Sequence, residues 1–246
     1  MQKVRIYNDC SKLAIWLRSF CGHIVILEGL ISAGKTTLGN SIEHLFNKHG
    51  ITKVKFFKEY KNQLLLDNYI DNMEEDAYSF QMIMLRERFH IYQEARNLAL
   101  QGYVIFIDRS LAGDLAFGLM QKDKFFSERQ WNVYLHTLEE GYKIEPSLIV
   151  YLYVPPAVAF KRMQERGEES EVNGYNLEYF EDLHESYQNA SKMINSNMIN
   201  HDWLEDKELY TLTASDSRLL IDKVVIEFLY FVYHQIHQHS LEELIN

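Results

Sequence analysis

The stretch HIVILEGLISAGKTT, residues 23–37, joins a short apolar run to a glycine-rich loop. Residues 23–28 have no polar face, as is typical of a buried strand in a parallel sheet. Residues 29–36 then fit the pattern G-x-x-x-x-G-K-[ST], in which backbone N–H groups close around phosphate oxygens. Within it, Lys35 supplies a cation to the β- and γ-phosphates and Thr36 offers a hydroxyl to Mg²⁺. The expected nucleotide-binding residues of the loop are Gly29, Ser32, Ala33, Gly34, Lys35, Thr36 and Thr37.

Strands and helices alternate on either side of this loop. The hydrophobic pattern predicts further strands at residues 54–57, 103–107 and 148–154, with a weaker one at 209–213. It predicts helices at residues 36–49, 76–100, 127–140, 177–198 and 217–237. Such alternation indicates an α/β fold of the P-loop NTPase type, in which helices flank a mostly parallel five-stranded sheet in three layers. Ligands of such sheets bind beyond the carboxyl ends of the strands.

Composition excludes several classes of protein. With 246 residues, 47% of them hydrophobic, the chain suits one domain over residues 1–246, of which residues 1–22 form an N-terminal extension. A net charge of −10 argues against binding of a nucleic acid polymer, and no apolar run is long enough for a membrane span. Cys10 and Cys21 are interpreted as reduced thiols of a cytoplasmic protein. His234, His237 and His239 are interpreted as polar residues at a helix end, because no cysteine or carboxylate completes a metal-binding set.

Three further stretches carry chemistry at the same end of the predicted sheet. The second strand ends in FFKE, residues 56–59, which places a carboxylate there. The third strand ends in DRS, residues 108–110. On the long helix at 76–100, helical spacing allows four side chains to face one pocket, namely Phe80, Gln81, Met84 and Arg88. An amphipathic helix packed on the core is the alternative interpretation of that helix.

Together these motifs resemble the deoxynucleoside kinase family, which includes deoxycytidine, deoxyadenosine and deoxyguanosine kinases. The resemblance extends from about residue 24 to about residue 187, and its spacing is closest to the shorter, bacterial-type members. It implies that Glu59 takes the proton from the sugar hydroxyl and that Arg109 steadies phosphate charge. It also implies that Asp108 helps Thr36 to hold Mg²⁺.

The resemblance assigns the acceptor pocket as well. It implies that Tyr69 and Glu178 bind the sugar 3′-hydroxyl and that Gln81 pairs with the base edge. Arg88 and Asp114 would select amino-bearing bases such as cytosine and adenine, although an ordinary salt bridge between helices is the alternative. The similar substrate segment also supplies Phe80, and helical spacing adds Met84 to the substrate site. The resemblance further implies that Phe117 stacks on the base, and that Arg162 and Arg166 belong to a lid at about residues 162–175 that closes over the triphosphate.

The expected reaction is ATP-dependent phosphorylation of the 5′-hydroxyl of a deoxyribonucleoside, either deoxycytidine or a purine deoxynucleoside. The family also implies a homodimer. Two alternatives stay open: a nucleoside monophosphate kinase similar to thymidylate kinase, and a P-loop module that binds ATP without turnover. An acceptor that already carries a phosphate would need additional arginines, whereas Glu59, Tyr69 and Glu178 favour a nucleoside.

Overall fold

The computed structural model describes residues 21–193 and residue 229. The predicted strand at 209–213, the helix at 217–237, the three histidines, Cys10 and nearly all of the N-terminal extension lie outside the described residues. So does the last part of the helix predicted to end at residue 198. Leu229 is buried in the hydrophobic core.

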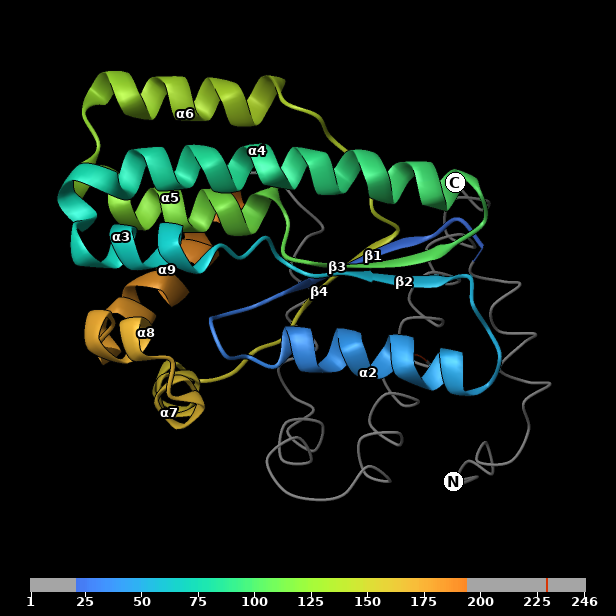
Figure 1. Ribbon diagram of the computed structural model, residues 1–246. Coiled ribbons are helices and arrows are strands. Elements are labelled where there is room, and N and C mark those ends of the chain that lie inside the picture. The colour runs from blue at the N-terminus through green and yellow to red at the C-terminus, as the bar shows by residue number, and fades with distance from the viewer. Residues whose placement is uncertain (1–20, 194–228, 230–246) are drawn as a thin grey trace.

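The described part of the chain builds a parallel sheet of four strands, β1 (Ile24–Glu28), β2 (Val54–Phe57), β3 (Val104–Asp108) and β4 (Leu148–Tyr151), in the order β2-β3-β1-β4 (Figure 1). The strand predicted at 148–154 is three residues too long. Its partner β1 ends at Glu28, and the N–H of Leu152 donates to the carbonyl of that residue, so regular pairing stops there.

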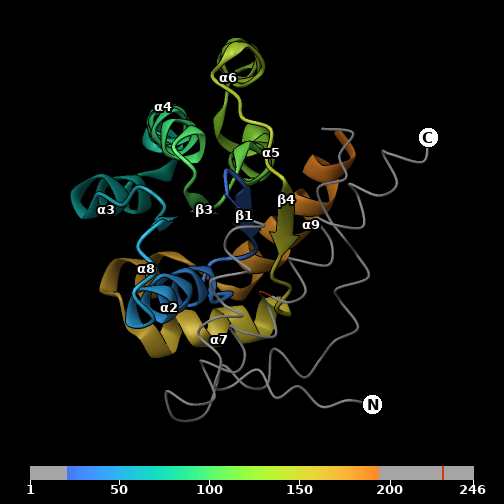
Figure 2. The ribbon, with the colours of Figure 1, turned by 90° about the vertical axis from the view of Figure 1, so that its right-hand side faces the viewer.

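Eight described helices accompany the sheet: α2 (Lys35–Lys48), α3 (Gln63–Asp71), α4 (Met73–Leu100), α5 (Leu111–Phe125), α6 (Glu128–Glu140), α7 (Pro156–Arg166), α8 (Glu169–Gly174) and α9 (Leu177–Met193). Helix α2 covers one face of the sheet, α4 and α5 cover the other, and α6 lies outside them (Figures 1 and 2). The described chain thus has the predicted helix–sheet–helix layering. None of the helices in the described ranges is long and apolar enough to cross a membrane.

Helices α3, α5 and α8 were not predicted. Helix α5 is buried on most of its surface, including Gly113, Ala116 and Gly118, so no polar stripe reveals a helical period. Its first turn is capped by the Ser110 side chain, which accepts from the N–H of Ala112. The cap begins the helix directly after the DRS motif, and α5 therefore starts beside the expected site.

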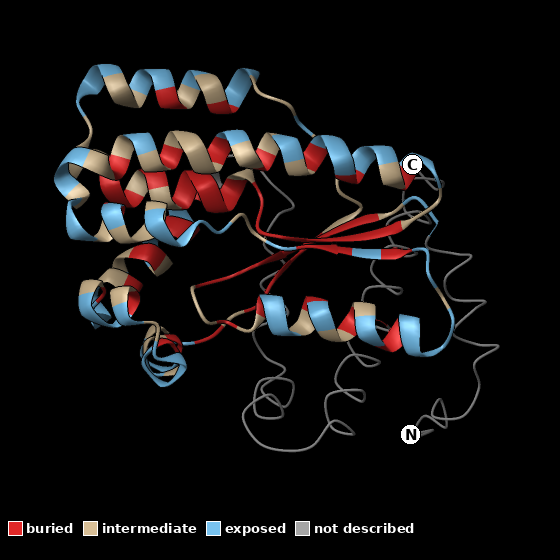
Figure 3. Cartoon of the chain, viewed as in Figure 1, coloured by how far each residue is buried: buried red, intermediate tan, exposed pale blue. Residues whose placement is uncertain are grey.

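The strands are buried along almost their whole length (Figure 3). Alternate side chains of β1 belong to two different core clusters. Val25 and Leu27 pack in the same cluster as Ile42 of α2. Ile24 and Ile26 pack with Tyr92 of α4. Because both faces are covered, the strands are almost wholly apolar. β1 and β3 end in the carboxylates Glu28 and Asp108, and Lys55 of the edge strand β2 is exposed.

Candidate active site

The glycine-rich loop leaves β1 and enters the first turn of α2. Gly29 has φ +141°, and a Cβ there would lie 2.6 Å from the carbonyl oxygen of Leu152, so only glycine fits. Gly34, with φ +101°, precedes the helix, and Ser32 also lies in the left-handed region at φ 58°. This backbone directs the loop around the N-terminus of α2, where unpaired N–H groups and the helix dipole favour an anion.

Lys35 is buried at the base of the loop. Its Nζ donates to the carbonyls of Gly29 at 2.9 Å and Leu30 at 2.8 Å. Burial, together with the nearby positive charge of Arg109, lowers the pKa of Lys35 to about 8. A buried ammonium whose hydrogen bonds within the described residues go to neutral carbonyls is well suited to a strongly anionic ligand such as a polyphosphate.

Two oxygen-bearing side chains meet where β3 approaches the loop. Thr36 Oγ1 donates to Asp108 Oδ2 at 2.7 Å. The other carboxylate oxygen, Asp108 Oδ1, is buried without a hydrogen-bond partner in the described part of the chain. A buried carboxylate oxygen of this kind needs a compensating ligand, and hydroxyl and carboxylate oxygens are what Mg²⁺ prefers. The two residues therefore fit the metal that the loop motif implies.

Arg109 adopts a left-handed backbone conformation, with φ 73°, which is costly for a residue with a Cβ. Arg88, reaching over from α4, holds this turn. Its Nη1 donates to the carbonyls of Asp108 at 2.7 Å and of Arg109 at 3.2 Å. The long helix α4 thus stabilises the backbone that carries the DRS motif.

Glu59 follows β2 and forms ion pairs with both arginines. Arg109 Nε lies 2.9 Å from its carboxylate, and Arg88 Nη2 lies at 3.4 Å. Burial alone raises the pKa of Glu59, but Arg109 and Arg88 outweigh that effect, so the pKa lies below the usual value for a glutamate. Glu59 is therefore an ionised acceptor at neutral pH, and its side chain keeps 30% of its surface exposed to the cavity.

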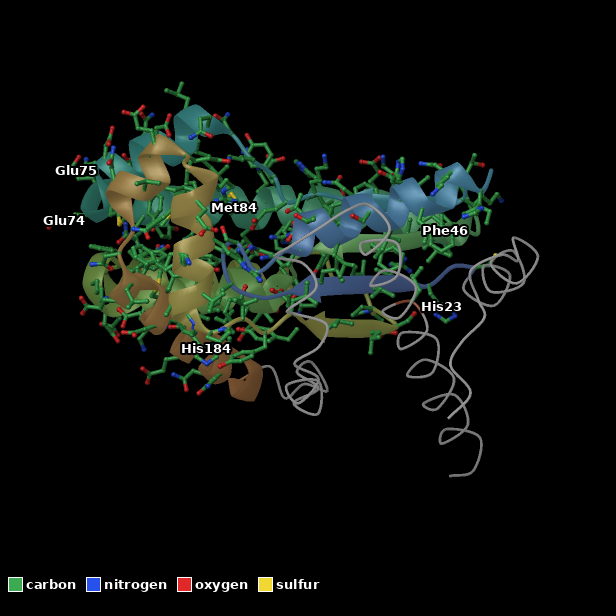
Figure 4. The ribbon with its side chains drawn as sticks, turned by 90° about the horizontal axis from the view of Figure 1, so that it is seen from below. His23, Phe46, Glu74, Glu75, Met84 and His184 are labelled. Carbon is green, nitrogen blue, oxygen red and sulfur yellow. The ribbon has the colours of Figure 1, made fainter. Side chains whose placement is uncertain are left out.

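A cavity of about 280 Å³ opens between the loop, the ends of β2 and β3, and α4, α5 and α8. In Figure 4, Met84 lies at this end of the sheet, whereas His23 lies at the opposite end. The volume is close to the lower end of the range for ligand pockets and suits a small ligand. Twelve of the expected site residues line it, namely Ser32, Lys35, Thr36, Glu59, Phe80, Gln81, Met84, Asp108, Arg109, Asp114, Phe117 and Arg166.

The α5 wall of the cavity carries an aromatic ring and an acid. The Arg109 guanidinium lies over the ring of Phe117 at 5.0 Å. Asp114 accepts from Arg88 Nε at 3.0 Å, and both side chains are almost fully buried. Arg88 uses its donors on Asp114, Glu59 and two carbonyls, and it lies behind the cavity wall, not in its lining.

Other expected residues lie elsewhere. Tyr69 is fully buried, its ring stacks on Phe80 at 4.3 Å, and its hydroxyl accepts from Gln121 Nε2 at 2.7 Å, so it supports the wall from behind. Glu178 is exposed on α9 outside the cavity. Arg162 of α7 and the exposed Thr37 of α2 also lie outside the lining, while Gly29, Ala33 and Gly34 shape the loop without lining the cavity.

Sequence reasoning missed several lining residues. Glu171 on α8 is buried, lines the cavity and forms an ion pair with Arg166. Tyr175 lines the cavity close by, and Lys58 and Lys61 contribute from the β2–α3 loop. Glu171 stands among other acidic residues in the sequence, where only the fold of the short helix α8 determines which of them turns inward.

The loop can hold a triphosphate, and an ionised carboxylate and a guanidinium line the same cavity. This arrangement at the carboxyl end of a parallel sheet defines a phosphotransferase of the P-loop class. A family model described as deoxynucleoside kinase matches residues 24–241, and the chain belongs to that family. The coarse fold, the enzyme class and the family resemblance predicted from the sequence are confirmed.

Individual proteins similar to this chain include nucleoside and nucleotide kinases. A deoxyadenosine kinase of Dictyostelium discoideum is 26% identical over 74% of this chain and 72% of its own length. A thymidylate kinase of Brachyspira hyodysenteriae is 24% identical over 59% of this chain and 70% of its own length. The structure of deoxyadenosine kinase from M. mycoides, with the products dCMP and a flexible dCDP bound, superimposes with a TM-score of 0.61 at 19% identity. That match covers 83% of this chain and 98% of the other, and it supports the fold.

Proposed function

We propose that the protein transfers the γ-phosphoryl group of ATP to the 5′-hydroxyl of a deoxyribonucleoside. The observation that carries this proposal is that Glu59, from the end of β2, lines the same cavity as Lys35 and Thr36 of the phosphate loop. A carboxylate in that position can orient a hydroxyl nucleophile toward a terminal phosphate.

In the proposed reaction, the 5′-oxygen forms a bond to the γ-phosphorus while the bond from phosphorus to the bridging oxygen of ADP breaks. The hydroxyl proton passes to the Glu59 carboxylate. Arg109 and Lys35 stabilise the charge on the transferring group, in a site where they are already in place before the reaction. Mg²⁺, held by Thr36 and Asp108, would neutralise phosphate charge when bound.

The base is expected to lie between α4 and α5. Gln81 offers both a donor and an acceptor from its amide to the base edge, and Phe117 offers a ring face. Asp114 lines the cavity as an acceptor, while its partner Arg88 is already saturated. A carboxylate accepts from an exocyclic amino group and repels a carbonyl oxygen. This favours deoxycytidine and deoxyadenosine over thymidine.

We propose that Glu171, in place of Glu178, takes the sugar 3′-hydroxyl. Glu171 is buried and faces the cavity, whereas Glu178 faces solvent. Tyr175 lines the cavity beside it and can supply a hydroxyl, the part that the sequence assigned to Tyr69.

The charges near the lid argue against an acceptor that already carries a phosphate. Lys61 forms an ion pair with Glu168, and Arg166 is paired with Glu168 and Glu171. These lid-side cations are therefore already neutralised, whereas a nucleoside monophosphate would bring two further negative charges. A thymidylate-kinase-like activity would require these pairs to break.

Steady-state turnover with MgATP tests the proposal directly, using deoxycytidine, deoxyadenosine, deoxyguanosine, thymidine and thymidine monophosphate as acceptors. We expect deoxycytidine or deoxyadenosine to have the highest kcat/KM and thymidine monophosphate to have none that is measurable. Preferred turnover of the monophosphate would overturn the proposal in favour of a nucleotide kinase. Absence of turnover with every acceptor, together with ATP binding, would favour a binding module.

A further inference from the structure

Glu28 is a buried carboxylate for which the proposed reaction has no direct use. It is the last residue of β1 and directly precedes the phosphate loop, with 3% of its surface exposed. Its Oε1 accepts from Ser110 N and Oγ, each at 2.5 Å, and from the N–H of Gly113 at 3.2 Å. Burial raises the pKa of Glu28, and Arg109 and the donors directed at its carboxylate offset part of that loss of hydration.

The backbone around Glu28 is shaped to allow these contacts. A Cβ at position 113 would lie 2.9 Å from Glu28 Oε1 and 3.1 Å from the hydroxyl of Tyr187. Glycine at this point therefore lets the first turn of α5 approach the carboxylate closely. Ser110, which donates to Glu28, also caps α5 and directly follows Arg109 in the chain.

Tyr187 of α9 connects this carboxylate to the active-site arginine. Its hydroxyl donates to Glu28 Oε2 at 3.0 Å and accepts from Arg109 Nη1 at 2.5 Å. Its ring packs edge-on against Tyr151 of β4, with centroids 5.4 Å apart. The phenol is therefore fixed by the sheet on one side and by two charged groups on the other.

Arg109 is consequently held at both ends of its guanidinium. Nε pairs with Glu59, which faces the acceptor, and Nη1 bonds to Tyr187 and to the carbonyl of Gly29 at 2.9 Å. A long side chain on a strained backbone would otherwise sample many rotamers. Two fixed hydrogen bonds on Nη1 reduce that freedom before any ligand binds.

We infer that Glu28 and Tyr187 are positioning residues that hold the Arg109 guanidinium toward the transferring phosphoryl group. This inference rests on the proposed phosphoryl transfer. Tyr187 acts through Arg109, and Glu28 acts by orienting the Tyr187 hydroxyl so that its lone pair faces Nη1. Preorganised charge of this kind lowers the barrier without strengthening substrate binding.

The first test is Tyr187→Phe, which keeps the ring against Tyr151 and removes only the hydroxyl. We expect kcat to fall about tenfold, while KM for ATP and for the nucleoside stays within about twofold. Tyr134→Phe is the matched control, because it removes another buried hydroxyl, one that donates to a backbone carbonyl at 2.6 Å. If the control lowers kcat as much as Tyr187→Phe does, the positioning role is wrong.

A double-mutant cycle with Arg109→Lys separates positioning from general support of the fold. If Tyr187 acts through Arg109, adding Tyr187→Phe to Arg109→Lys changes kcat by less than about twofold. Full additivity of the two effects would overturn the inference. Glu28→Gln, which retains the shape of the side chain but removes its charge, is expected to lower kcat as Tyr187→Phe does.

A readout that needs no turnover keeps this inference separate from the proposed function. In ¹⁵N-arginine spectra of the full chain, the Arg109 side-chain signals are assigned by their loss in Arg109→Lys. We expect slow guanidinium rotation in the wild type and fast rotation in Tyr187→Phe. Slow rotation without turnover of any nucleoside would reject the proposed function alone, and equal rotation in both proteins would reject the positioning role alone.

Discussion

At the scale of single residues, three buried cations lie at or behind the cavity wall, namely Lys35, Arg88 and Arg109, and the two arginines are paired with carboxylates. Arg88 is shared by Asp114 and Glu59, and Arg109 is shared by Glu59 and, through Tyr187, by Glu28. Glu59 pairs with both arginines. It therefore holds the arginines in place and remains an ionised acceptor on the cavity side.

Glu59→Gln tests its part in proton transfer. The amide has nearly the same shape but cannot accept a proton at neutral pH, so we expect kcat to fall by about 10²-fold or more while KM changes little. Initial rates with the best nucleoside measure both constants. Retention of more than half of the wild-type kcat would remove Glu59 from the mechanism.

At the scale of elements, the short helix α8 determines which glutamate faces the cavity. Its short turn directs Glu171 inward, and its contact with α3 is tight enough that a Cβ on Gly174 would lie 2.0 Å from the side chain of Ile70. Helix α9, which begins at Leu177, instead leaves Glu178 exposed.

Glu171→Gln and Glu178→Gln form a matched pair of variants. We expect Glu171→Gln to lower kcat/KM for a deoxyribonucleoside about tenfold, because a hydrogen bond to a charged group is lost. Its effect on a 2′,3′-dideoxynucleoside should be small, since that substrate lacks the 3′-hydroxyl. Glu178→Gln should alter neither substrate by more than about twofold. The opposite ranking would return the role to Glu178.

The phosphate-loop helix α2 is placed by close packing on β2. A Cβ added at Gly39 would lie 2.3 Å from the ring of Phe56. Alanine normally stabilises a helix interior relative to glycine, but here we expect Gly39→Ala to lower the free energy of unfolding by about 1–3 kcal/mol, because the core is overpacked. Urea unfolding measures the change, with Asn40→Ala on the exposed face as the control. Unchanged or increased stability of Gly39→Ala would contradict the packing.

At the scale of the whole molecule, the phosphate loop and Glu59 line one cavity. If this cavity binds both ATP and a nucleoside as proposed, the two ligands should stabilise the fold in two steps. We expect MgATP to raise the Tm, and deoxycytidine or deoxyadenosine to raise it again in the presence of a non-hydrolysable ATP analogue. Each ligand at about 100 times its Kd contributes about 2.7 kcal/mol. The Tm is measured by thermal unfolding with each ligand alone and with both ligands together. A response to nucleotide alone would indicate a module that binds ATP without an acceptor.

The sequence by itself determined the α/β class, the phosphate loop, most strand positions and the family. All four features depend on local signals, namely a glycine pattern, apolar runs and motifs at strand ends. Such signals can be recognised without knowledge of distant contacts. Gln81 and Met84 could also be predicted to face the site, because helical spacing places them on one side of α4. The buried helix α5 could not be predicted from the sequence, because its residues show no polar face.

Tertiary structure alone decided which of the neighbouring glutamates enters the cavity, that Tyr69 lies behind Phe80, and that Arg88 supports the DRS backbone. It alone brought Tyr187 of α9 to Glu28 and Arg109, which are separated from it by 159 and 78 positions. The physical reason is that side-chain direction at short helices, and contact between distant segments, depend on how the layers pack. No local pattern records that packing.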